Sequence, residues 1–308
     1  MSAAELLQRL LEQIGQTAHE AAKYAGQLRL QNDFPSQLTD VHLCIPKSLP
    51  DAVKFQAVDV AINTRADNAP TQDLLSSWSD HNIIGQELYS LCTTRYWEPT
   101  RDILTVSFLG DPSARFKASV MQALNRWDSA NRPKFVVTND IGEVRISAEP
   151  IGNWSFCGTD INLVPKHQAT TNFDVAAADI ASDVFFRVVQ HQAGHLLGFR
   201  HHPLPATLAQ RLNKERTLEY LEKLMGWSHS ISEQIVFGGV NMRDEDEALF
   251  SSSIMGWQFP SCLSIDGLPV DGTSDISHAD IERINRVYGN DAMTQTIGNE
   301  GVQNPSPE

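Results

Sequence analysis

Three histidines in the segment His191-Gln-Ala-Gly-His195-Leu-Leu-Gly198-Phe-Arg-His201 have the spacing of a metal-binding site. Histidines four residues apart lie on one face of a helix, so the imidazoles of His191 and His195 can reach the same ion. Gly198 can adopt a positive φ that ends the helix, and the chain can then return with His201 as a third nitrogen ligand. Three histidines with a fourth position open are typical of a catalytic zinc site, and we predict bound Zn²⁺.

Two other interpretations of the histidines are less favoured. A zinc ion used only as a structural staple is usually enclosed by four protein ligands rich in cysteine, and no C-x-x-C pair occurs in the sequence. A helix that carries three histidines by chance would not be expected to have a glycine at position 198, between the second and third histidines, where the chain must turn. The neighbouring His202 precedes Pro203 and is expected beside the site or exposed to solvent, rather than on the metal.

The histidine segment resembles the metzincin signature H-E-x-x-H-x-x-G-x-x-H, except that Gln192 stands in the glutamate position. A second family feature, a turn containing methionine beneath the zinc, is matched by Ser252-Ser-Ile-Met255-Gly-Trp257, 54 residues after His201. Further similarity to astacin-like and matrixin-like catalytic domains covers roughly residues 97 to 289. The resemblance implies a zinc metalloendopeptidase that acts on a protein or peptide substrate, with Met255 as the hydrophobic floor of the site.

Gln192 changes the expected chemistry. In this type of site, the glutamate accepts a proton from the zinc-bound water and passes it to the leaving amine. The glutamine amide has nearly the same shape but is not a base at neutral pH. We therefore expect an inactive protein whose fold and metal site are intact. Two explanations remain open: a catalytic glutamate that was exchanged for glutamine, or a natural pseudoprotease that serves as a zinc-containing protein-binding module.

Trp257 is a second departure from the related families. Astacin-type members carry a tyrosine two residues after the turn methionine, where it can touch the metal or the oxyanion. The indole of Trp257 can donate one hydrogen bond but cannot ligate zinc, so the tyrosine role is in doubt here.

The pattern around the histidines predicts an α+β fold with a twisted mixed sheet, an active-site helix and a lower lobe that contains the Met-turn. Strands are expected at 103–109, 135–137 and 143–147, with helices at 114–131 and from about Asp174 into the histidines. Asn153–Asp160 could form the edge strand along which an extended peptide pairs. We divide the chain into an N-terminal extension (1–95), a catalytic domain (96–290) and a disordered tail (291–308).

The N-terminal extension is expected to pack against the catalytic domain. An amphipathic helix over residues 3 to about 30 has an apolar stripe of leucines that needs a partner, and a helical stretch should end near Cys92. Cys44 could supply a thiolate to the fourth zinc position, as matrixin prosegments do. The residues around it do not match that family's switch motif, which favours a buried or disulfide-bonded cysteine instead.

Composition limits the partners. The formal net charge is −14, from 24 Lys and Arg against 38 Asp and Glu, which disfavours nucleic acid and anionic membrane surfaces. The acidic run Asp244–Glu247 lacks the spacing of a calcium loop and is expected to be a solvated loop. No signal peptide is visible, so we expect the protein to be either cytoplasmic or secreted by a leaderless route. We also expect a monomer.

Overall fold

The computed structural model describes residues 44–78, 86–127, 133–150, 152–174, 180–202, 204–225, 228–237 and 252–289. Within them lies a six-stranded sheet of order β1-β5-β6-β4-β2-β3. Its strands are β1 (Cys44–Pro46), β2 (Ile103–Phe108), β3 (Lys134–Val137), β4 (Val144–Ser147), β5 (Asn153–Ser155) and β6 (Thr171–Asn172). Strands β3, β2, β4 and β6 run parallel, whereas β5 is antiparallel to β6. The expected mixed sheet is therefore confirmed.

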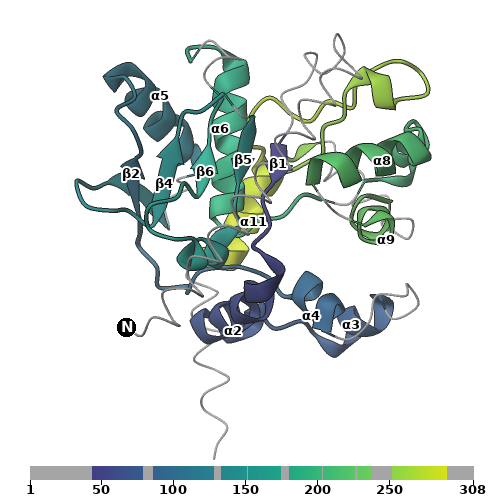
Figure 1. The fold of residues 1–308 in the computed structure, drawn as a ribbon, viewed down its shortest axis with the longest axis horizontal. Helices are drawn as coiled ribbons and strands as arrows, with labels where there is room; N and C mark the ends of the chain where they lie inside the picture. Colours follow the sequence, from purple (N-terminus) through teal and green to yellow (C-terminus); the bar gives the residue numbers. More distant parts are fainter. Residues whose placement is uncertain are drawn as a thin grey trace, which may run out of the picture.

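Two helices accompany the sheet and form the main core with it. Helix α5 (Ala114–Leu124) packs against α6 (Asp183–Leu196), and α6 also contacts β5. The rings of Phe116 and Phe185 meet at the α5–α6 contact, with centroids 6.0 Å apart. Figure 1 shows α6 running behind β5 and β6, with α11 (His278–Tyr288) below it.

The prediction that the active-site helix begins near Asp174 is wrong. Helix α6 begins at Asp183, because the Ser182 side chain accepts a hydrogen bond from Phe185 N and so caps the first turn. Asp183 adds a negative charge to the same turn, where the helix dipole favours it.

A second hydrophobic core forms the lower lobe. It gathers residues between Leu204 and Val270, including those of α8 (Lys214–Met225), of the short helix α7 (Ala206–Ala209) and of the π-helix Glu233–Phe237, which follows α9 (His229–Ser232). Met255 belongs to the main core and Trp257 to the second one, so the Met-turn joins the two lobes. The acidic run at 244–247 and the tail from 291 lie outside the described residues.

Within the described ranges 51–78 and 86–92, the α-helices at the base of the domain are α2 (Lys54–Thr64), α3 (Gln72–Trp78) and α4 (Gln86–Cys92). The sequence pattern predicted no helix at the position of α2. Helix α2 packs against the 3-10 helix Gly158–Leu163, and Ala57 enters the main core. The predicted helix over residues 3–30 lies outside the described residues. No helix in the described ranges is long and apolar enough to cross a membrane.

Asn68 ties this base to the segment 94–96, which precedes the first strand of the parallel part of the sheet. The side chain is fully buried, and its amide donates to the carbonyls of Ala61 and Tyr96 at 2.9 and 2.8 Å. Its carbonyl oxygen accepts from Tyr96 N and from the Thr94 hydroxyl. All the hydrogen-bonding capacity of one side chain is thus used to hold residues 94–96 against α2.

We predict that Asn68→Ala lowers the free energy of unfolding by about 2–4 kcal/mol, because several buried backbone groups lose their partner. Chemical denaturation measures the change. Asn63→Ala, at an exposed position of α2, is the matched control and should change stability by less than about 0.5 kcal/mol. Equal effects of the two substitutions would show that Asn68 does not hold the base to the domain.

Candidate metal centre

The structure brings together the three histidines that the sequence singled out. His191 Nε2 lies 2.9 Å from His201 Nε2, and Cys44 Sγ lies 3.3 Å from His195 Nε2. One ligand atom from each of these four residues lies within 4.8 Å of the others. A tetrahedral zinc site with Zn–N bonds of about 2.0–2.1 Å separates two nitrogens by roughly 3.3 Å and a nitrogen and a sulfur by roughly 3.6 Å. The donor set and its spacing therefore fit a zinc ion.

Backbone carbonyls orient two of the imidazoles toward this point. His191 Nδ1 lies 2.6 Å from Ile254 O, and His195 Nδ1 lies 2.8 Å from Phe199 O. A carbonyl can only accept, so each Nδ1 carries the proton and each Nε2 is left with its lone pair for a metal.

Burial also favours the neutral imidazoles that bind metals. Desolvation lowers the pKa of His195 to about 4 and lowers the pKa values of His191 and His201 well below their usual range. At neutral pH all three imidazoles are therefore neutral, which is the state that binds a metal.

The turn after α6 aims His201 back at the other two ligands. Gly198 has a φ of 92°, which confirms the predicted left-handed residue at the helix end. Its N–H donates to His195 O, and Phe199 N donates to Gly194 O, which is the Schellman arrangement. A Cβ at Gly198 would also lie 2.7 Å from Arg95 O, so glycine is required for packing as well as for conformation.

The Met-turn is held from below by one buried carboxylate. Asp280 accepts hydrogen bonds from Ile254 N and Ser253 Oγ, and it closes the capping box of α11 with Ser277. The carbonyl of Ile254 in turn holds His191. Asp280 is therefore linked to the metal centre through the backbone of a single residue, Ile254. Asp280 lies within the region of family similarity, but the sequence did not predict that it supports the Met-turn.

Met255 packs directly under α6, as expected for the floor of the site. A Cβ on Gly194 would collide with Met255 Sδ and with the Trp127 ring, so the glycine within the histidine motif makes room for the floor. The signal for Gly194 was visible in the sequence, since a glycine inside a helix destabilises it by about 1 kcal/mol and usually has a packing reason.

Trp257 takes a role that the sequence did not predict. Its indole stacks on the His201 imidazole, with ring centroids 3.9 Å apart and planes inclined by 22°. The ring of Phe259 also stacks on Trp257, with ring centroids 5.7 Å apart. No carbonyl of the described residues is seen to hold His201 as carbonyls hold His191 and His195, so the stack on Trp257 contributes to setting its ring plane.

Cys44 lies at the metal centre, and this corrects the favoured interpretation of a merely buried or disulfide-bonded cysteine. The thiol is free and half-buried, and it faces the three histidines. Desolvation raises the pKa of Cys44 to about 12, and the amide of Gln192 opposes this shift. A thiolate would form here only with a cation beside it. The sequence around Cys44 gave no such signal, because its position follows from the pairing of β1 with β5, and Cys44 lies 151 residues from His195 in the chain.

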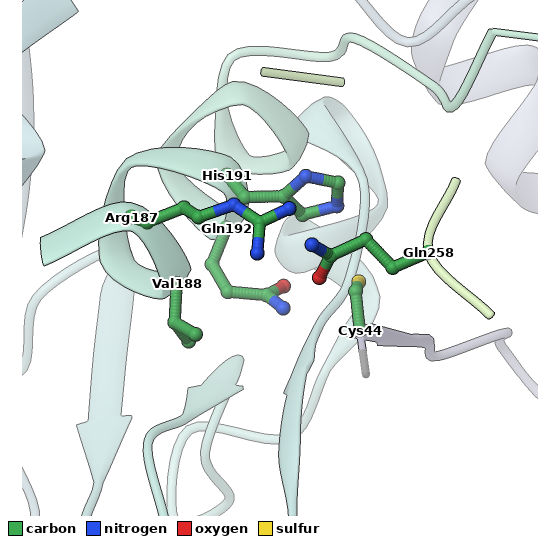
Figure 2. Close-up of a pocket in the computed structure, with 6 residues that line it drawn as sticks. All are labelled: Cys44, Arg187, Val188, His191, Gln192 and Gln258. Atoms are coloured by element: carbon green, nitrogen blue, oxygen red, sulfur yellow. The ribbon is translucent and has the colours of Figure 1, made fainter. Parts of the chain in front are cut away.

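Gln192 is buried beside the thiol, and its amide faces Cys44 without a regular hydrogen bond to any described residue. Figure 2 shows the amide directed toward Cys44 from the α6 side. An amide aimed at a metal centre in this way is placed to contact a ligand or a water there. His202 is not among the ligands, since its Nε2 lies 3.0 Å from Ser253 Oγ and supports the Met-turn.

Comparisons with known proteins agree with this geometry. A crystal structure of myroilysin aligns with a TM-score of 0.52 and 25% sequence identity, over 63% of this chain and 86% of that one. The chain has an astacin-like metalloprotease fold. A second structure of myroilysin aligns at a TM-score of 0.53 and 22% identity, over 72% and 97% of the two chains.

A hatching enzyme zinc-protease of the medaka fish Oryzias latipes aligns at a TM-score of 0.41 and 18% identity, over 63% of this chain and 94% of that one. No protein-family model matches the sequence, and no curated protein matches it.

We predict one zinc ion per chain purified without added metal, measured by elemental analysis. His195→Ala should reduce zinc affinity by at least about 100-fold, because one of three imidazole ligands is lost. His229→Ala, at a position on α9 remote from the cluster, should leave affinity unchanged. Undiminished zinc binding by His195→Ala would refute the ligand set.

We also predict that Trp257→Leu weakens zinc binding by about 10- to 100-fold, the range for residues that orient metal ligands. Trp257→Phe keeps an aromatic face against His201 and should restore most of the affinity. Phe259→Leu is the control, because it alters the same stack without touching His201. Chelator competition gives the affinities, and equal losses in Trp257→Leu and Phe259→Leu would indicate a general packing defect.

Proposed function

We propose that this chain is a zinc metalloendopeptidase held in a latent form, with Gln192 at the position of its general base. The observation that carries the proposal is the approach of Cys44, His191, His195 and His201 to within 4.8 Å of one another. A structural zinc staple would also have four ligands, but it would not need a buried amide without a regular hydrogen bond beside the metal. The astacin-like fold supports a protein or peptide as the substrate.

The chain's own residues divide the work as follows. Bound zinc would supply a Lewis acid and lower the pKa of a water that replaces the Cys44 thiol. The carbonyls of Ile254 and Phe199 keep His191 and His195 in the tautomer that binds it. Gln192 can hydrogen-bond that water but cannot accept its proton, so the proton transfer that begins hydrolysis is missing.

Strand β1 supports the latent state. It pairs in parallel with β5, with Cys44 opposite Asn153 and Pro46 opposite Ser155. It therefore occupies the edge where the sequence suggested that an extended peptide would pair. Figure 1 shows β1 between β5 and the lobe that contains α8. A substrate strand and β1 cannot use this edge at the same time.

Lys47 fastens β1 to this edge. Its backbone N–H donates to Ser155 O at 3.1 Å, and its ammonium lies 3.7 Å from the centre of the Trp154 ring. This cation–π contact stabilises the docked strand in addition to the pairing of β1 with β5. Trp154 itself is buried on β5 and belongs to the main core.

The alternative is a pseudoprotease that binds proteins in the cleft without cutting them. Gln192 itself favours this reading, since the isolated site lacks a base. In that case Cys44 would gate binding rather than hydrolysis.

A two-by-two set of variants tests the proposal. We expect Gln192→Glu combined with Cys44→Ala to cleave denatured protein at a rate at least about 10² times that of the parent chain, because the base is restored and the fourth position is opened. Gln192→Glu alone should be slow, and Cys44→Ala alone should be inactive. Initial rates on a diverse peptide library, with and without a zinc chelator, measure this.

Each outcome has one meaning. Cleavage by the double variant that the chelator abolishes supports the endopeptidase. Full activity of Gln192→Glu with Cys44 in place would show that Cys44 does not block the site. A zinc-loaded double variant that cleaves nothing in the library, while it binds peptides, would establish the pseudoprotease instead.

A further inference from the structure

Arg200 lies between two residues that serve the metal centre. Phe199 before it supplies the carbonyl that orients one imidazole, and the residue after it is the ligand His201. The Arg200 side chain is bonded to the base of the domain, where Nη1 donates to Leu91 O and Nη2 donates to Thr93 O at 2.8 Å. A planar guanidinium that holds two carbonyls at once is fixed in position, and it fixes the backbone to which it is attached.

The two residues before this arginine rest on the same segment, residues 91–96 at the end of α4. Arg95 O lies against Gly198, where a Cβ would come within 2.7 Å of it. The Phe199 ring meets the Tyr96 ring edge-on, with centroids 5.5 Å apart. Three successive residues of the turn after α6 therefore lie against one segment of the chain.

Segment 91–96 is itself held from several sides. Arg95 Nε donates to Asp160 Oδ1 at 2.6 Å, and Arg95 Nη1 donates to Thr93 O at 2.8 Å. Thr93 O therefore accepts from both arginines, and Asp160 is a counter-charge for both of them. The buried Asn68 side chain bonds to the same segment. The turn thus rests on a support that is fixed independently of any metal.

The placement of His201 needs such a support. The stack on Trp257 restrains the plane of the imidazole, but stacked rings can slide past each other, so the stack alone does not fix where the ring lies. On the other side of the ligand, His202 N donates to Met255 O at 3.1 Å. The backbone of His201 is therefore held between an anchor on the Met-turn and an anchor on the base, and Arg200 is the second of these.

We propose that Arg200 is a positioning residue for the zinc ligand His201, and that residues 91–93 of the base are part of the metal centre. A ligand must be held within about 0.5 Å of its productive position, and hydrogen bonds from a charged donor are stronger than those between neutral groups. The inference rests on the zinc site of the proposed function but not on hydrolysis. It gives two N-terminal parts opposite roles: β1 blocks the site, whereas the base supports it.

Zinc affinity of the full chain provides the first test. Arg200→Met removes both hydrogen bonds and should weaken zinc binding by about 10- to 100-fold, the range for groups that orient metal ligands. Arg145→Met is the matched control, because Arg145 is buried and also donates to carbonyls, those of Gly142, Val164 and Gln168, in loops that carry no metal ligand. It should lower stability but leave zinc affinity within about threefold of the parent value. Chelator competition gives the affinities, and chemical denaturation of the metal-free forms gives the stabilities.

The visible spectrum of Co²⁺ bound in place of zinc provides the second test, because its absorption bands report the geometry of the ligands. We expect Arg200→Met to change the positions and intensities of these bands and Arg145→Met to leave them as in the parent chain. A general loss of stability would not alter the bands of folded, loaded protein. Arg200→Lys keeps the charge but lacks the fork of donors, so its zinc affinity should remain at least about threefold below the parent value. If Arg200→Met does not fold, Arg200→Lys serves for both measurements.

The two measurements separate the possible failures. A larger loss of zinc affinity in Arg200→Met than in Arg145→Met, at a similar loss of stability and with altered cobalt bands, supports the positioning role. Equal affinities in the two variants with unchanged bands overturn that role and leave the endopeptidase proposal standing. Parent affinity in Arg200→Lys overturns the two-point anchor. A parent chain that binds no zinc overturns the metal centre of the proposed function and this inference with it.

Discussion

The metal centre depends on how the Met-turn is fixed under α6. Asp280, buried at the start of α11, holds the backbone of Ile254, and Ile254 O fixes the tautomer of His191. Three residues further along, Trp257 stacks on the ring of His201. Met255 between them fits only because Gly194 leaves room in the helix above. A single turn thus orients two of the three imidazoles, although it lies more than fifty residues from them in the sequence.

The same turn explains how the two lobes are joined. Met255 packs into the core shared by the sheet and α6, while Trp257 packs into the core shared by α7, α8 and the segment up to Val270. A metal bound at the junction would link both cores, because His191 and His195 belong to the helix of one lobe and His201 stacks on an aromatic residue of the other. Metal occupancy and the packing of the lobes are therefore thermodynamically coupled.

The sequence predicted those parts of the site that depend on local spacing. The shared helix face of His191 and His195, the positive φ of Gly198 and the methionine under the site follow from helix geometry and from a recognisable motif. Features that require distant segments to meet were not predictable in this way. Cys44 reaches the histidines because β1 pairs with β5. Asn68 contacts Tyr96 beside α2, a helix that the sequence pattern did not predict. The early start predicted for α6 failed because a cap at Ser182 outweighed the apolar residues before it.

The position of Cys44 relative to α2 has a kinetic consequence. Only residues 47–53 separate β1 from a helix that is packed into the domain. The thiol is therefore a tethered ligand, present near its site at an effective concentration of the order of millimolar or higher, whatever its concentration in solution. A docked strand that opens by chance will close again faster than a dilute peptide can enter. In the proposed latent form, exchange of inhibitor for substrate becomes efficient only when the tether is cut or β1 is captured elsewhere, so latency is controlled by chain connectivity as well as by the strength of the metal–sulfur bond.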